Sequence, residues 1–289
     1  MNIQKIVQKL DAYERLMRLD KPIGALLLLW PTLCALLIAG QGKPDGRIVL
    51  VFVMGTVLMR SAGCVMNDIA DMKYDGMVER TQHRPLAKSE VSKKEAYFLA
   101  AILSLIAFCF ALFLNPLTIK LSVLALFLAA SYPLTKRFFA IPQAYLGIAF
   151  GFGIPMAFSA INGFIPQTAW ILLLANVFWA VAYDTEYAMI DREDDLTIGI
   201  KSSAITFGRY DVVAVMVCYV LTLLLLVLAG NQLAMGGAYY MGLLAATGVA
   251  ISHYFLIRSR EKSKCFQAFL GNNWFGFAVF VGVAANYFA

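Results

Sequence analysis

Long apolar stretches separated by short polar gaps make up most of this chain. A helix needs about 20 apolar residues to cross the hydrocarbon core of a bilayer. Lipid offers no partner to free backbone N–H and C=O groups, so each stretch that crosses must be helical. We expect nine spans, near residues 23–40, 48–68, 95–114, 117–132, 138–160, 168–190, 212–229, 235–257 and 266–288. The pattern therefore predicts an all-α, polytopic membrane protein.

Composition supports this interpretation and excludes several classes of protein. Of the 289 residues, 61% are hydrophobic and 15% are charged. Soluble domains are about 45–50% apolar and about 25% charged. A soluble enzyme, a disordered chain, a collagen-like fibre and a secreted disulfide scaffold are therefore excluded. The net charge of +6 lies in the gaps between apolar stretches, so membrane topology explains it and we expect no nucleic-acid partner.

Basic residues alternate between the two sides of the predicted bundle. All but four of the 24 Lys and Arg residues lie in the N-terminal tail or in the gaps after the second, fourth, sixth and eighth spans. The four others are Lys43, Arg47, Arg60 and Lys120. Cytoplasmic loops of membrane proteins carry an excess of Lys and Arg. The N-terminus is therefore expected in the cytoplasm, and nine spans place the C-terminus on the opposite side of the membrane.

Three polar segments on the cytoplasmic side complete the predicted organisation. Residues 1–20 include an amphipathic stretch, and we expect a helix there that lies on the membrane surface or caps the bundle. Residues 69–94 and 191–211 are expected to form cytoplasmic cap loops. The whole chain, 1–289, is expected to be one domain.

Candidate chemistry lies at the cytoplasmic ends of the second and sixth spans. Segments 67–75 and 184–195 together hold half of the chain's 18 acidic residues. Asn67, Asp71 and Asp75 are four residues apart, so they share one face of a helix. Solvated acids at the end of a span would explain one such segment equally well.

The second segment repeats the arrangement of the first. Asp184, Asp191 and Asp195 are spaced i, i+7 and i+11, again on one helix face. An Asp at the centre of a span costs about 2.5–3.5 kcal/mol, so a cation is expected to offset these charges. Oxygen ligands without nearby His or Cys favour Mg²⁺ or Mn²⁺ over zinc. Two facing clusters suggest two metal sites that hold one polyphosphate between them.

Motifs along the whole chain carry a resemblance to a known family. Residues 16–24, 60–68, 80–86, 183–195 and 199–202 resemble the UbiA superfamily of intramembrane prenyltransferases, and within it the bacterial 4-hydroxybenzoate polyprenyltransferases. The resemblance implies helices around a central cavity with cytoplasmic caps. It implies transfer of a polyprenyl group from its diphosphate to the ring carbon ortho to the hydroxyl of 4-hydroxybenzoate, in ubiquinone biosynthesis. It also implies a bacterial inner membrane and an active site that faces the cytoplasm.

The resemblance and the spacing together suggest roles for the acidic residues. The expected metal and diphosphate set is Asn67, Asp71, Asp191 and Asp195, followed by Asp75. Asp71, Asp191, Asp68 and Asp184 are expected to be catalytic. Asp68 and Asp184 could be further ligands or could hydrogen-bond to the ligands, and one of them could be a base near the phenol.

Basic and aromatic residues complete the predicted site. Lys201 and Arg84 are candidates for contact with the diphosphate, and ordinary positive loop charge is the alternative. A guanidinium is expected to bind the carboxylate of the aromatic acid. The candidates, in order, are Arg137, Arg18 and the deeply placed Arg60.

Three tyrosines, Tyr132, Tyr183 and Tyr187, are expected to line the cavity and to face a developing carbocation. Their alternative is an ordinary place in the interfacial belt of aromatic side chains.

Two other functions remain open at this point. A prenyltransferase of the same kind could use another acceptor, such as a dihydroxynaphthoate, homogentisate, haem or a sugar. An ion-coupled transporter would also place carboxylates inside a bundle, but transporter sites tend toward the bilayer midplane. The clusters lie at the cytoplasmic ends of their spans, which favours an enzyme.

Overall fold

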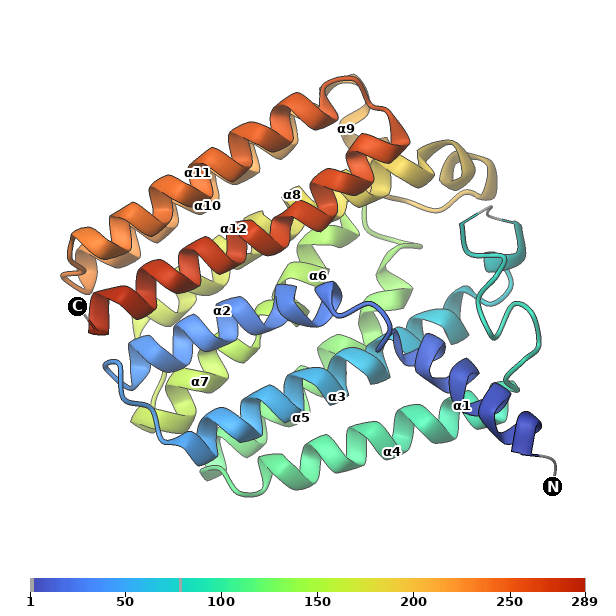
Figure 1. Ribbon diagram of the computed structural model, residues 1–289, viewed down its shortest axis with the longest axis horizontal. Coiled ribbons are helices and arrows are strands. Elements are labelled where there is room, and N and C mark those ends of the chain that lie inside the picture. Colours follow the sequence, from blue (N-terminus) through green and yellow to red (C-terminus); the bar gives the residue numbers. More distant parts are fainter. Residues whose placement is uncertain (1–2, 78–79, 289) are drawn as a thin grey trace.

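The computed structural model describes residues 3–77 and 80–288, and this part of the chain is helical without strands. Figure 1 shows long, roughly parallel helices joined by short connections. The elements are α1 (Ile3–Met17), α2 (Ile23–Ala39), α3 (Gly46–Asp71), η1 (Asp75–Met77), α4 (Lys93–Ala111), α5 (Pro116–Thr135), α6 (Pro142–Gly151), α7 (Gly153–Asn162), α8 (Gln167–Ile198), α9 (Ser203–Phe207), η2 (Gly208–Tyr210), α10 (Asp211–Gln232), α11 (Gly237–Ile257) and α12 (Lys262–Phe288).

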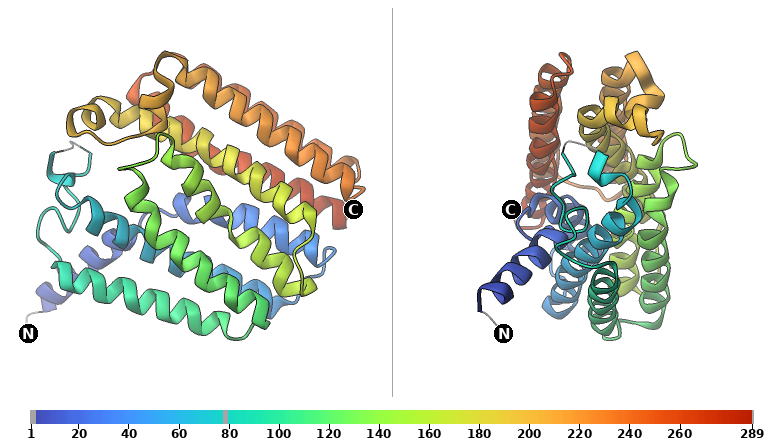
Figure 2. Two further views of the ribbon diagram at one scale, coloured as in Figure 1. Left: turned by 180° about the vertical axis from the view of Figure 1, so that it is seen from behind. Right: turned by 90° about the vertical axis from the view of Figure 1, so that its right-hand side faces the viewer.

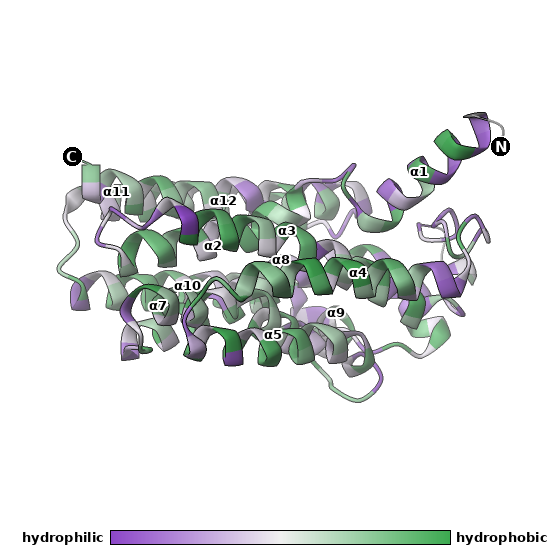
Figure 3. Cartoon of the chain, turned by 90° about the horizontal axis from the view of Figure 1, so that it is seen from below, coloured by the Kyte–Doolittle hydropathy of each residue, from purple (hydrophilic) through white to green (hydrophobic). Residues whose placement is uncertain are grey.

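The predicted all-α membrane fold is confirmed. Within the described residues, eight helical segments are long and apolar enough to cross a membrane, and α2 is a shorter apolar helix of 17 residues. Two elements form one of these segments, because the predicted span 138–160 is divided into α6 and α7. Apolar residues cover the lengths of the helices, while polar residues gather toward their ends (Figure 3).

Two groups of helices build the bundle. One group contains α8, α10, α11 and α12, in which α11 packs on α12 and α10 packs on α8. The other contains α2 to α7, with α3 packed on α4 and with α6 connecting to the first group through α8. The α6–α8 contact is close because position 147 is glycine: a Cβ there would lie 2.8 Å from Cα of Val177.

The two ends of the bundle differ, as the charge pattern predicts. Helix α1, the segment between α3 and α4 and the segment between α8 and α10 lie at one end, and the C-terminus lies at the other (Figures 1 and 2). Ala12 and Leu16 pack against Val65 and Ile69 of α3, which ties α1 to the bundle. The contact of α1 with a membrane surface stays a prediction.

One predicted cap differs from the structure. The loop expected at 191–211 is wrong over residues 191–198, because α8 continues without a break to Ile198. A helix can extend past the bilayer into water, so the end of the apolar pattern does not mark its end. Gly199, with φ of 74°, terminates α8 in the left-handed conformation that glycine adopts readily. The other expected cap, 69–94, begins with the last turn of α3 and continues as η1 and turns to α4.

Candidate active site

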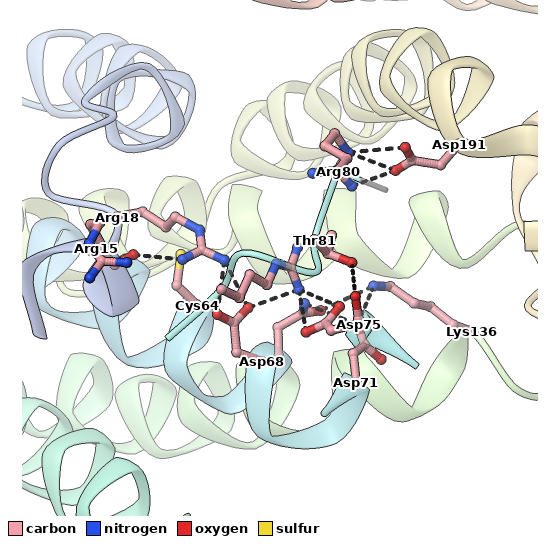
Figure 4. Close-up of polar contacts among 12 residues, drawn as sticks. Arg15, Arg18, Cys64, Asp68, Asp71, Asp75, Arg80, Thr81, Lys136 and Asp191 are labelled. Carbon is pink, nitrogen blue, oxygen red and sulfur yellow. Dashed lines mark hydrogen bonds and ion pairs between the residues drawn. The ribbon is translucent and has the colours of Figure 1, made fainter. Parts of the chain in front are cut away.

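A cavity of about 1060 Å³ lies inside the bundle. At one end it is lined by every member of the predicted acidic set, namely Asn67, Asp68, Asp71, Asp75, Asp184, Asp191 and Asp195. Its lining also includes apolar side chains near the other end of the helices, among them Phe52 of α3 and Leu114 after α4. The bundle thus joins a charged mouth to an apolar interior, and Figure 4 shows the polar contacts at the mouth.

Asp68 of α3 and Asp75 of η1 share one arginine. Asp68, whose side chain is 1% exposed, forms ion pairs with Arg18 at 2.9 Å and with Arg84 at 3.0 Å. Arg84 also donates to both oxygens of Asp75 at 2.9 Å. Burial raises the pKa of Asp75 to about 6, although the Arg84 guanidinium opposes this shift. Arg84 therefore bridges two carboxyl groups, one of which also has Arg18 as a partner.

Asp71 pairs with a lysine that the sequence interpretation did not select. Lys136 Nζ lies 3.1 Å from Asp71 Oδ2 and 3.1 Å from Asn67 Oδ1. Asn67 also donates to Asp71 at 3.1 Å. The spacing contained the signal, because Lys136 follows Tyr132 by four residues and so shares its helix face. Its Nζ lies 5.7 Å from the centre of the Tyr132 ring.

Asp191 of α8 binds Arg80 from the segment between α3 and α4. Arg80 Nε lies 3.0 Å from both carboxylate oxygens. The same guanidinium donates to the hydroxyl of Tyr187 and lies 4.6 Å from the centre of its ring. Arg80 belongs to residues 80–86, one of the motifs that carry the family resemblance, but the sequence alone suggested no role for it. It connects the cap segment to α8 across the mouth of the cavity.

Asp184 and Asp195 have no ion pair within 4.0 Å among the residues that the structure describes. Asp184 receives a side-chain hydrogen bond from Gln143. The amide of Gln143 is oriented by Ser203, whose backbone N–H donates to Gln143 Oε1 at 3.0 Å. Two carboxyl groups on α8 thus line the cavity without a paired cation from the described part of the chain.

The three arginines proposed for the aromatic acid occupy different places. Arg137 is exposed, donates to the backbone oxygen of Ala70 at 3.3 Å and is absent from the cavity lining, so its prediction as first candidate is not supported. Arg137 lies in the turn that follows α5, where its backbone N–H donates to the backbone oxygen of Leu134 at 3.1 Å. Arg18 reaches the cavity, where it pairs with Asp68.

Arg60 of α3 differs from both. It lines the cavity one turn before Cys64, whose Sγ it contacts, and its guanidinium lies 5.9 Å from the centre of the Phe150 ring. Its Nε is buried and has no hydrogen-bond partner within the described chain. Gly24 makes room for it, because a Cβ there would lie 2.5 Å from Nη2. Among the described residues, Arg60 forms no ion pair with a carboxylate.

The remaining predicted side chains also reach the cavity. Tyr132, Tyr183 and Tyr187 line it, and Phe269 of α12 lies 4.6 Å from Tyr187 between ring centres. Lys201 lines it too, with its Nζ 3.2 Å from the backbone oxygen of Phe138.

The acidic residues suit a divalent cation that arrives with a phosphate. Among residues 3–77 and 80–288, no group of three or more His, Cys, Asp or Glu side chains is close enough to hold a metal ion by itself. The available donors are carboxylate and amide oxygens, which magnesium prefers. Magnesium commonly uses one or two carboxylates and takes its other ligands from water and substrate phosphates. The site therefore fits a metal–diphosphate complex better than a metal bound by protein alone.

Comparison with known proteins agrees with this geometry. The model of the UbiA prenyltransferase family matches residues 28–280. The chain belongs to this family. It is 65% identical over 282 residues to 4-hydroxybenzoate octaprenyltransferase of Methylobacillus flagellatus, covering 97% of this chain and 95% of that protein. It is 64% identical over 279 residues to the enzyme of the same name from Azoarcus sp., covering 96% and 97%.

Solved structures of the family share the fold. A UbiA homolog from Aeropyrum pernix K1 in its apo form has a TM-score of 0.76 and 25% identity, over 90% of this chain and 96% of that one. A UbiA homolog from Archaeoglobus fulgidus bound to GPP and Mg²⁺ has a TM-score of 0.71 and 18% identity, over 93% and 99%. The arrangement of helices around the cavity is therefore that of the family.

Proposed function

We propose that this chain transfers a polyprenyl group from polyprenyl diphosphate to the ring carbon ortho to the hydroxyl of 4-hydroxybenzoate, and releases diphosphate, in ubiquinone biosynthesis. The observation that carries the proposal is the cavity of about 1060 Å³, which joins a mouth of carboxylates and guanidinium groups to an apolar interior. Such a cavity suits a ligand with a charged head and a hydrocarbon tail. Relatives 58–65% identical over nearly the whole chain are named 4-hydroxybenzoate octaprenyltransferase.

Residues at the mouth would hold the diphosphate and its metal. Asp71, Asp191 and Asp195, with Asn67 and Asp75, supply oxygen ligands for Mg²⁺, and Mn²⁺ has the same preference. The metal would stabilise the negative charge that develops on the departing diphosphate. Arg84 and Lys201 are proposed to contact the phosphate oxygens, and we add Arg80 and Lys136 to this proposal because they line the same cavity.

Arg60 is the residue best suited to bind the carboxylate of the acceptor. A buried guanidinium with an unpartnered N–H is unfavourable, and a bound carboxylate would accept from it in a charge-assisted hydrogen bond. Arg18 is already paired with Asp68, and Arg137 lies outside the cavity. We therefore assign the aromatic acid to the deeper side of the mouth.

The reaction balances with the groups that line the cavity. The allylic C–O bond breaks, and its electron pair leaves with the diphosphate. The ring carbon ortho to the phenol forms the new C–C bond and then loses its proton. Asp184 is our candidate to accept this proton, because it faces the cavity without a paired cation and Gln143 holds its side chain. Tyr132, Tyr183 and Tyr187 can stabilise the positive charge, while apolar walls exclude water.

The proposed location follows from the charge pattern. We infer a bacterial inner membrane, with the N-terminus and the mouth of the cavity on the cytoplasmic side and the C-terminus on the periplasmic side. The positive-inside rule supports this orientation, because the basic gaps and the carboxylate clusters lie at the same end of the bundle. A diphosphate made in the cytoplasm would then reach the mouth directly.

Purified protein in lipid vesicles tests this function. The protein is given polyprenyl diphosphate, 4-hydroxybenzoate and Mg²⁺, with a chelator in a parallel sample, and products are identified by mass spectrometry. We expect a prenylated acid that forms only with metal. Product that forms equally with chelator contradicts the metal assignment. Turnover of a different aromatic acceptor alone contradicts the substrate, and no turnover of any acceptor favours a transporter.

A further inference from the structure

A second polar cluster lies outside the cavity, between the helices α8, α10, α11 and α12. We call it the rear cluster: Trp179 and Glu186 of α8, Tyr219 of α10, His253 of α11 and Asn272 of α12. All five side chains are buried, with Glu186 and Asn272 0% exposed, and none of them lines the cavity. Buried polar groups within apolar helices are costly and are usually retained for a function.

Direct contacts connect the four helices through this cluster. The hydroxyl of Tyr219 lies 3.0 Å from Glu186 Oε1, 2.8 Å from His253 Nδ1 and 2.8 Å from Asn272 Oδ1. Asn272 Nδ2 donates to Glu186 Oε2 at 2.7 Å, and Trp179 Nε1 donates to Asn272 Oδ1 at 2.8 Å. Both carboxylate oxygens of Glu186 are therefore held, one by α10 and the other by α12.

Stability alone does not explain such a cluster. Well-packed apolar side chains of similar volume are often as stabilising as a buried polar network. A hydrogen-bonded network differs because its bonds form only when each helix has one particular rotation about its axis and one particular position along that axis. The rear cluster can therefore fix how α8 is rotated and how α12 stands against it.

A chain of contacts leads from the rear cluster to the mouth of the cavity. Asn272 lies three residues after Phe269 on α12, so the two side chains are on neighbouring positions of that helix. The Phe269 ring lies 4.6 Å from that of Tyr187 on α8. Tyr187 accepts a hydrogen bond from Arg80, and Arg80 binds Asp191. A shift of α12 against α8 would therefore move the partner that orients Arg80.

We propose that Glu186 and Asn272 are positioning residues: they fix α12 against α8 so that Phe269 and Tyr187 hold Arg80 on Asp191. The expected effect on turnover rests on the proposed function, whereas the expected effect on the position of Tyr187 does not. Loss of the rear cluster weakens binding of the diphosphate substrate and leaves binding of the aromatic acid, which is assigned to Arg60 on α3, unchanged.

The experiment compares variants with two measurements. Glu186→Leu and the milder Asn272→Ala remove the contacts between α8 and α12, while Glu186→Gln keeps the size and two polar atoms of the side chain. Ser159→Ala is the matched control, because it removes a buried hydrogen bond to Thr118 of 2.8 Å that is remote from the cavity mouth. The first measurement is the ¹⁹F spectrum of 3-fluorotyrosine placed at position 187, recorded without substrates. The second is the KM for each substrate.

We expect Glu186→Leu and Asn272→Ala to shift or broaden the fluorine signal and to raise the KM for the diphosphate about tenfold, with the KM for the acid within twofold. Glu186→Gln should restore most of both properties, and Ser159→Ala should change neither. An unchanged fluorine signal in both disruptive variants overturns the proposal, as does an equal change in Ser159→Ala. Because the spectrum needs no turnover, it decides the proposal even if the enzyme assay fails.

Discussion

The acidic clusters of α3 and α8 look alike in sequence, yet the structure neutralises them differently. Each of the three aspartates at the end of α3 and in η1 has an ion pair, with Arg18, Arg84 or Lys136. On α8, Asp191 pairs with Arg80, while Asp184 and Asp195 have no such partner within the described residues. Two carboxyl groups of the α8 cluster are therefore free of basic partners within the described chain, whereas at α3, and at Asp191, a metal must compete with a basic side chain.

The largest expected effect tests whether both clusters act together. Asp71→Asn and Asp191→Asn each keep the size of the side chain and remove its charge, so each should lower turnover by at least about 10²–10³-fold. Rates of prenyl transfer are measured alongside circular dichroism, which should show an unchanged helical fold. Near-normal turnover in either variant would remove that residue from the ligand set and make the other cluster the principal site.

The next effect concerns binding of the aromatic acceptor, which is assigned to Arg60 and not to either acidic cluster. Arg60→Gln removes a charge-assisted hydrogen bond of about 1.5–3 kcal/mol, which corresponds to a rise of about 10–100-fold in the KM for the acid. The KM for the diphosphate should stay within twofold. A larger change for the diphosphate would instead place Arg60 with the cations at the mouth.

A smaller effect concerns pH and Asp75 beside the α3 cluster. Burial raises the pKa of Asp75 to about 6, so this carboxyl is increasingly protonated as the pH falls below that value. A metal needs the ionised form, and the Mg²⁺ concentration for half-maximal binding of inorganic diphosphate should rise about fourfold from pH 7.5 to pH 5.5. Titration calorimetry at both pH values measures it. If Asp75→Asn keeps the full dependence, Asp75 is not its source.

The smallest effect is expected at the arginine beside the α3 cluster. Arg137→Ala should change both KM values and turnover by less than twofold, because Arg137 is exposed and contacts only a backbone oxygen in the described structure. Lys136→Ala is the matched variant and should raise the KM for polyprenyl diphosphate about tenfold, because it removes the ammonium group proposed to contact the phosphate oxygens. Equal effects of the two substitutions would contradict the difference between them.

Much of the fold could be predicted because membranes restrict the choices. Apolar length and basic gaps were sufficient for the helices and their alternation, since lipid excludes other backbone structures. The end of α8 could not be found in this way, because a helix in water ends at a residue such as Gly199 and not where its apolar residues end.

The site was predictable where residues share a helix and less so where they do not. Asn67 and Asp71 are related by helical spacing, and so are Tyr132 and Lys136. The expectation that Asp75 continues the same helix face is wrong, because α3 ends at Asp71 and Asp75 reaches the cavity from η1. Arg80 and Arg84 belong to a segment without regular spacing, so only the structure shows which carboxylate each one binds. Arg137 was the first candidate for the acceptor carboxylate on residue type and position after a span, but it lies in the turn after α5 and outside the cavity lining, which the sequence pattern does not reveal.

The pairing of Arg18 with Asp68 has a practical consequence for handling this protein. Arg18 directly follows α1, so a fusion or tag at the N-terminus would be attached to the helix that precedes a residue of the cavity mouth. The C-terminus emerges at the far end of the bundle (Figure 1). Affinity tags and reporters therefore belong on the C-terminal side, where pulling or crowding leaves the reaction chamber undisturbed.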